Sequence, residues 1–239
     1  MSDSKLDVRV YPIDEPKGST IAFASVAVDD LIAIRGIRVV DNEKGMFVSM
    51  PQSKSEKDGK TDYHDIAFPL TADLRKEISK AILDEYNIVS NLAPNERKYD
   101  KQEMEAANGK SAEDVKLDIR VYPLEEPQGN TKAFASVSVD DSVAIRGVRV
   151  VEGEKGLFVT MPQSKSEKDG KTDYHDVAFP INGDLRKAIN KAILNEYSAA
   201  DKSKDKTLAD GLKKGTEKAA ENAAKPREAA KSKNAGVLE

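Results

Sequence analysis

An internal duplication limits the possible folds of this chain more than any other feature of its sequence. Residues 5–87 align without gaps on residues 116–198 at a constant offset of 111, and 61 of the 83 aligned positions are identical. Exchanges in the apolar stretches nearly preserve side-chain volume, as in Ile37/Val148 and Met46/Leu157, and a packed core tolerates such exchanges. The two copies are therefore predicted to share one fold, which a chain of 239 residues has room to form twice.

Each copy begins with short segments whose composition and alternation are typical of β-strands. The turn signal Asp29-Asp30 indicates a hairpin between the second and third segments, and Gly36 indicates a bulge in the third. A polar hairpin loop is expected over 52–61, with Asp58-Gly59 as its turn signal, before the last strand. Five strands are expected in each copy, and in the first copy they cover residues 6–11, 20–28, 31–40, 46–50 and 63–68.

From residue 71 onward the apolar period changes from 2 to 3.6, which predicts a helix. Leu74, Ile78 and Ile82 recur at helical spacing, and Thr71, which is Asn182 in the second copy, is a suitable N-cap. The fold class is thus α+β, with each unit a small antiparallel sheet of about five strands followed by one C-terminal helix. Units of roughly 80 residues bury little surface alone, so the copies are expected to pair as an intramolecular pseudo-dimer. Exposed sheet edges leave room for further homo-oligomers.

The remaining segments are strongly polar. Residues 88–115 are expected to be a charged linker, helical over 96–107, between the repeats at 5–87 and 116–198. Residues 199–239 are rich in Lys, Ala and Glu, with ten basic and seven acidic side chains. This tail is predicted to be disordered or marginally helical.

Composition excludes several classes of protein. The chain has no Cys, which excludes disulfides and thiolate chemistry. It has no apolar run long enough to span a bilayer and no secretory signal at its start, so a cytoplasmic protein without a membrane partner is expected. The net charge of −4 excludes a strongly cationic coat for nucleic acid but permits a local basic surface. No phosphate-binding loop, nucleophile elbow or dinucleotide motif occurs, so we expect no enzyme and no cofactor.

The pair His64-Asp65, with Asp62 nearby, recurs as His175-Asp176 and is the only grouping of histidine with carboxylates. General-base or metal chemistry would draw on such groups. On a strand, however, adjacent side chains point to opposite faces. An ordinary strand histidine is therefore favoured over a catalytic or metal-binding one, and no metal site is expected.

Basic residues form two candidate surfaces for nucleic-acid phosphates. One is the polar loop, which carries three lysines at three-residue spacing, and the other is one edge of the helix. Glu77 and Asp84 are replaced by Ala188 and Asn195, so the second copy's helix is the better candidate. A solvated loop and helix face would explain the same charges. The candidate residues are Lys54, Lys57, Lys60, Arg75, Lys76 and Lys80, and their counterparts Lys165, Lys168, Lys171, Arg186, Lys187 and Lys191.

An ordered series of motifs in both copies resembles the SpoVG family of bacteria, known as stage V sporulation protein G or septation protein. In the first copy these motifs are Ile37-Arg38-Val39-Val40, the segment 45–51 that ends in Met50-Pro51, Asp58-Gly59, the segment 64–69 and Leu83-Asp84-Glu85-Tyr86; the second copy has counterparts at 148–151, 156–162, 176–180 and 194–197. The resemblance implies a dimer that binds DNA and RNA with site preference and affects gene expression, sporulation and septum formation. It also implies that the loop lysines belong to the family's basic loop. The family has adjacent Lys-Arg there, and an Arg where this chain has His64 or His175.

The preferred interpretation is a non-enzymatic regulator of bacterial gene expression, linked to sporulation or septation, that binds DNA, RNA or both. Its loops and helix edges would contact phosphates. The alternative is a protein-interaction module with weak or no nucleic-acid binding, which the net acidity favours. A hydrolase using His64 and Asp65 is a third and weaker interpretation.

Overall fold

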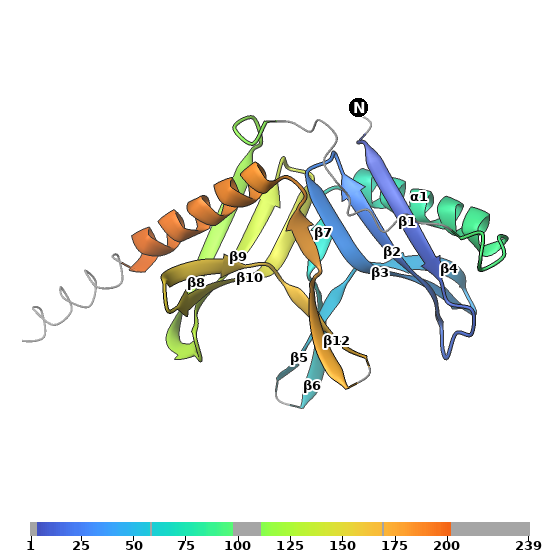
Figure 1. Cartoon of the computed structure of the whole chain (residues 1–239), viewed down its shortest axis with the longest axis horizontal. Helices are drawn as coiled ribbons and strands as arrows, with labels where there is room; N and C mark the ends of the chain where they lie inside the picture. The colour runs from blue at the N-terminus through green and yellow to red at the C-terminus, as the bar shows by residue number, and fades with distance from the viewer. Residues whose placement is uncertain (1–3, 58, 98–110, 169, 202–239) are drawn as a thin grey trace, which may run out of the picture. The chain divides into compact units, whose positions relative to one another are not determined.

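A computed structural model describes residues 4–57, 59–97, 111–168 and 170–201 of the chain (Figure 1). The first repeat forms β1 (Leu6–Pro12), β2 (Thr20–Val28), β3 (Ile32–Asn42), β4 (Gly45–Ser49), β5 (Gln52–Lys57), β6 (Lys60–Asp65), β7 (Ala67–Pro69) and α1 (Ala72–Ser90). The second forms β8 (Leu117–Gln128), β9 (Thr131–Val139), β10 (Val143–Gly153), β11 (Gly156–Thr160), β12 (Gln163–Lys168), β13 (Lys171–Asp176), β14 (Ala178–Pro180) and a helix over residues 183–201. Residues 98–110 of the expected linker and 202–239 of the tail lie outside the described residues.

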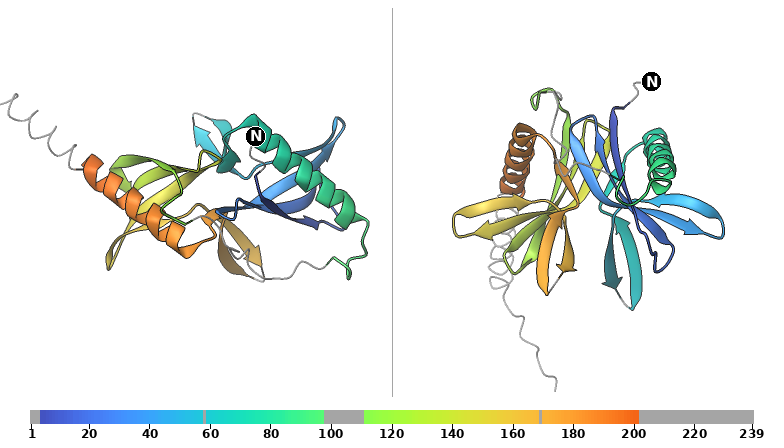
Figure 2. Two further views of the ribbon diagram at one scale, coloured as in Figure 1. Left: turned by 90° about the horizontal axis from the view of Figure 1, so that it is seen from above. Right: turned by 45° about the vertical axis from the view of Figure 1, so that its right-hand side comes forward.

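Two antiparallel sheets of five strands are present, and each repeat ends in one helix, which confirms the predicted α+β class. Strands β1, β2, β3 and β4 pair in chain order, and β8 to β11 repeat the pattern. Thr71 caps α1 as predicted, because its hydroxyl accepts a hydrogen bond from the Leu74 amide at 3.2 Å. The helices lie on one side of the sheets, and the β5–β6 and β12–β13 hairpins project from the other (Figures 1 and 2). No helix among the described residues is long and apolar enough to cross a membrane.

The segment expected as a polar hairpin loop over 52–61 is a ribbon of two strands that were not predicted, and the strand predicted over 63–68 is divided at Ile66 between β6 and β7. Strands β5 and β6 pair from Gln52↔Asp65 to Lys57↔Lys60. Ile66 interrupts the run, and its amide donates to the Pro51 carbonyl at 2.8 Å. The alternation of polar and apolar residues marks strands with one buried face. A ribbon with both faces in solvent shows no such alternation, which is why the sequence pattern missed it.

Short strands are exchanged between the repeats. Strand β7 of the first repeat pairs with β10 of the second, and β14 pairs with β3. Backbone hydrogen bonds of 2.7 Å from the Arg35 amide to the Val177 carbonyl, and from the Arg146 amide to the Ile66 carbonyl, extend both pairings. Buried residues of both repeats belong to one contiguous hydrophobic cluster. Each sheet is therefore completed by a strand from the other half of the chain.

A β-bulge in β3 determines which side chains face the core. Arg35 and Gly36 together lie opposite Ser25, because the pairing shifts between Val26↔Ile34 and Ala24↔Ile37. In a regular strand, residues three positions apart face opposite sides of the sheet. The extra residue restores the phase, and both Ile34 and Ile37 are fully buried. The bulge predicted at Gly36 is thus confirmed, and Gly147 occupies the same position in β10.

We predict that Gly36→Ala lowers the free energy of unfolding by about 1–2 kcal/mol, the usual cost of a left-handed backbone for an L-residue. Gly36 has a φ of +73°, and a Cβ there would have no neighbour within 4 Å, so the cost comes from backbone strain rather than a clash. Urea unfolding followed by far-UV circular dichroism measures it. Gly183→Ala is the control, because Gly183 opens a helix without a positive φ and alanine favours helices. Equal stability of Gly36→Ala and wild type would contradict the strain.

Candidate nucleic-acid interface

The hairpin lysines do not form one row. Lys54 lies opposite Tyr63 in the ribbon, whereas Lys57 lies opposite Lys60. Because side chains alternate along a strand, Lys54 lies on one face of the ribbon and Lys60 lies on the other. The second hairpin has the same register, with Lys165 opposite Tyr174. The three-residue spacing seen in the sequence therefore divides these residues between two faces.

The hairpin lysines also differ in whether they form ion pairs. Lys54 Nζ lies 2.5 Å from Glu56 Oε1, and Lys165 Nζ lies 2.6 Å from Glu167 Oε1. Lys60 and Lys171 are exposed and have no carboxylate partner among the described residues. They are thus the hairpin lysines best able to meet a phosphate. The side chains of Lys57 and Lys168 lie outside the described residues.

The predicted basic edge of α1 is largely neutralised by acidic neighbours. Lys80 Nζ lies 2.7 Å from Asp84 Oδ2, and this hydrogen bond, together with the negative charge of Asp84, raises the pKa of Lys80. Lys76 lies 3.9 Å from Asp73. The corresponding pair in the second helix is Lys187 with Asp184, at 3.0 Å.

Lys191 is an exception on the second helix. Its counterpart Lys80 pairs with Asp84, but Asn195 stands in the place of that aspartate. Lys191 has no carboxylate partner within residues 170–201 or the other described segments, and its side chain is exposed. This difference agrees with the expectation that the second helix is the better candidate for phosphate contact.

Arg75 and Arg186 link the helices to the hairpins. Arg75 Nη2 donates to Asp65 Oδ2 at 3.2 Å, and Asp65 Oδ1 accepts from Gln52 Nε2 at 3.0 Å. In the second repeat Arg186 binds Asp176 in the same way, at 3.3 Å. Asp65 is therefore held by the helix and by β5, while His64 is exposed on the hairpin. No group of three metal-ligating side chains occurs within the described part of the chain.

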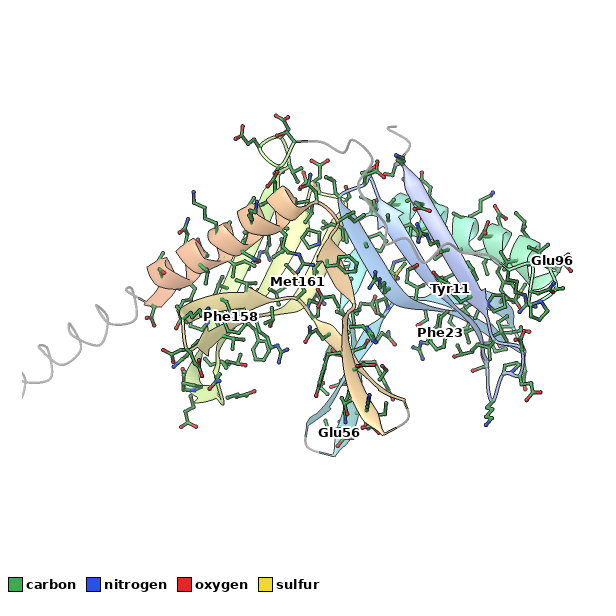
Figure 3. All side chains as sticks on the ribbon, viewed as in Figure 1. Tyr11, Phe23, Glu56, Glu96, Phe158 and Met161 are labelled. Atoms are coloured by element: carbon green, nitrogen blue, oxygen red, sulfur yellow. The ribbon has the colours of Figure 1, made fainter. Side chains whose placement is uncertain are left out.

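The structure has two recesses of interest, and each lies where a sheet meets a hairpin. The first recess, of about 360 Å³, is lined by Arg35 and Arg38 of β3, Phe23 of β2 and Tyr63 of β6, and by Ser164, His175 and Asp176 of the second repeat. The second recess, of about 330 Å³, is lined by the equivalent Arg146, Arg149 and Tyr174, and by Ser53, His64 and Asp65 of the first repeat. We call these the two arginine recesses. Figure 3 shows Phe23 on the side of the sheet from which the hairpin with Glu56 projects.

The arginines of the recesses differ from all other arginines in the described residues. Nine arginines fall in that part of the sequence, and five of them pair with a carboxylate: Arg9, Arg75, Arg97, Arg120 and Arg186. The other four have no carboxylate partner among the described residues, and all four line the arginine recesses. Sequence reasoning did not single them out. The repeated pattern Arg-Gly-Ile/Val-Arg around the bulge glycine was the signal available for finding them.

Comparison with known proteins agrees with this architecture. The SpoVG family model matches residues 4–88 and 115–199. A protein of Agathobacter rectalis is 42% identical over 80 residues, which are 34% of this chain and 87% of that protein. Proteins of Caldanaerobacter subterraneus, 41% identical over 83 residues, and Staphylococcus carnosus, 39% identical over 84 residues, are also similar; the match spans 35% of this chain in both cases, and 87% and 75% of those proteins. All three carry the name septation protein SpoVG. Since the matched segments are the two repeats and cover most of the chain, this protein belongs to the SpoVG family and contains two SpoVG units in tandem.

Proposed function

We propose that this chain is a non-enzymatic, cytoplasmic nucleic-acid-binding regulator of bacterial gene expression, acting in septation or sporulation. The observation that carries the proposal is a set of cations in the recesses and hairpins that have no carboxylate partner among the described residues, in a chain whose net charge is −4. These cations are Arg35, Arg38, Lys60, Arg146, Arg149 and Lys171. Phosphates are the anions that such a set of guanidinium and ammonium groups would bind. The exchange of β7 and β14 supports the further expectation that the two repeats act as one pair within the chain.

Binding assays across salt concentrations test the proposal directly. Fluorescence anisotropy would compare labelled duplex DNA, single-stranded DNA and RNA between about 50 and 200 mM salt, where phosphate contacts give a steep log–log dependence of affinity on salt. We expect micromolar or tighter binding with a clear slope. Absence of binding to all three probes at low salt would contradict nucleic-acid recognition.

Substituting the unpaired hairpin lysines is expected to weaken binding. In Lys60→Ala with Lys171→Ala, loss of two phosphate contacts should make the salt slope shallower by about two. Lys54→Ala with Lys165→Ala is the matched control, because these ammonium groups already pair with Glu56 and Glu167. It should change the slope less. An equal loss of slope in both double variants would show that ion pairing within the ribbon does not select the contacts.

A protein-interaction module is the second candidate function, and exposed apolar side chains favour it. Met46 and Phe47 in β4, and Leu157 and Phe158 in β11, are each at least 40% exposed. Large apolar side chains exposed on a strand can contact other proteins. If the anisotropy assays detect no nucleic-acid binding, these two strands become the first surfaces to probe for protein partners.

A further inference from the structure

We infer that each arginine recess holds a nucleotide of a single-stranded nucleic acid, with the base against the tyrosine and a phosphate on the two arginines. The inference rests on the proposed function. It adds a preference for single strands and a binding site distinct from the hairpin lysines. It is carried by three features of the recesses: exposed rings, positioned guanidinium groups without carboxylate partners, and polar groups from the opposite repeat.

Exposed aromatic rings provide the stacking surface. Tyr63 and its counterpart Tyr174 are each 63% exposed, although a tyrosine ring normally gains free energy by burial. Phe23, which is 46% exposed, lines the first recess together with Tyr63. Stacking on such a ring is available to every base, because each base has a flat π-face. The first recess therefore offers two rings, one from the sheet and one from the hairpin.

Three of the four recess arginines, Arg35, Arg38 and Arg146, contact neutral groups. Arg38 Nη2 donates to the hydroxyl of Ser49 at 3.2 Å, and the Arg35 guanidinium lies 4.6 Å from the centroid of the Phe179 ring. Arg146, which lines the second recess, has its guanidinium 4.6 Å from the centroid of the Phe68 ring. Such contacts orient a guanidinium without cancelling its charge. The remaining N–H donors are thus positioned for an anion, and the planar fork of Arg matches a phosphate.

The opposite repeat contributes polar groups to each recess. In the first recess these are Ser164 and His175, which can donate and accept hydrogen bonds at a base edge. The one carboxylate of that recess, Asp176, is already held by Arg186 and Gln163, at 3.3 and 3.0 Å. Its charge is therefore offset by Arg186 and does not oppose a phosphate at Arg35 and Arg38.

A duplex does not fit these features. Paired bases expose only their edges in the grooves, and their faces are covered by their neighbours in the stack. A base can reach Tyr63 face to face only when it is unstacked, as in a single strand. The recesses should therefore favour single strands, whereas the lysines at the hairpin tips contact phosphates of either form.

The test removes the rings and keeps the charges. Tyr63→Leu with Tyr174→Leu would be compared with wild type by anisotropy, using an oligothymidine of about 12 nucleotides and a duplex of equal length. Loss of stacking should lower the affinity for the oligothymidine by about tenfold and the affinity for the duplex by less than about twofold. Tyr63→Phe with Tyr174→Phe keeps both rings and should bind like wild type. Far-UV circular dichroism should show unchanged folding, because both side chains are exposed.

The outcomes separate the inference from the proposed function. One outcome is that wild type binds both probes while the leucine substitutions lower the affinity for both equally, or for neither. In that case the recesses do not hold bases and the inference is overturned. The phosphate-binding role of the hairpins then stands. If wild type binds the duplex more tightly than the oligothymidine, the inference is overturned as well. If wild type binds neither probe at low salt, both the inference and the proposed function fail.

Discussion

Replacing Ala178 with aspartate should lower the free energy of unfolding by about 3–5 kcal/mol, the cost of leaving a charge buried without a partner. Ala178 lies in the exchanged strand β14, opposite Ile34 of the other repeat, and its exposed fraction is 0%. The carboxylate would lie inside the cluster of apolar side chains that joins the repeats. Urea unfolding followed by far-UV circular dichroism gives the change in stability.

Ala72→Asp provides a matched control with the same change of side chain. Ala72 is exposed and is the first residue of α1, where a negative charge interacts favourably with the helix dipole. This variant should be as stable as wild type or slightly more stable. If the Ala178 variant also unfolds at the wild-type urea concentration, β14 does not occupy its place in the sheet of β3 in solution.

Ile189→Ala should destabilise the chain by about 2–5 kcal/mol, as expected for a large-to-small change in a packed core. Ile189 is fully buried on the second helix, and its counterpart Ile78 is fully buried on α1. Because the buried residues of both repeats form one cluster, the destabilisation should reach both repeats. Both should therefore unfold in a single transition.

Hydrogen exchange read by mass spectrometry can distinguish the repeats in this experiment. Peptides from β2 and β9 report on the first and the second sheet. In the Ile189→Ala variant both peptides should lose protection at the same urea concentration. If β9 exchanges while β2 keeps its native protection, the two repeats unfold independently, and their coupling through the core would be refuted.

Hydrophobic periodicity, together with the turn residues and glycines between apolar runs, predicted the parts of the fold that have one buried face. The hairpin around Asp29-Asp30, the helix after Thr71 and the bulge at Gly36 are all present. Periodicity could not predict the β5–β6 ribbon, since both faces of that ribbon are polar. It also could not predict the exchange of β7 and β14, because the pattern of a three-residue strand does not specify which sheet the strand joins.

The sequence predicted which types of residue form the candidate site but not how they are arranged in space. The sequence shows basic residues in the hairpins and helices, but spacing does not show that Lys54 pairs with Glu56 or that Arg75 pairs with Asp65. Arg35 and Arg38 were within reach of sequence reasoning, since a bulge at Gly36 places both on the same side of β3. Their proximity to Tyr63 depends on how the hairpin leaves the sheet, and this is a tertiary feature.

The strand exchange has a consequence for how the two halves of the molecule can change. In an assembly of separate subunits such an exchange would depend on concentration, whereas both donors here belong to one covalent chain and remain together at any dilution. The halves are also free to become unlike, as they have at Asp84 and Asn195. A homodimer presents equivalent sites and cannot distinguish the two directions of a bound polymer. A fused pair with unequal halves can. Under the proposed function, a nucleic-acid strand bound across both halves would therefore have a preferred 5′-to-3′ direction.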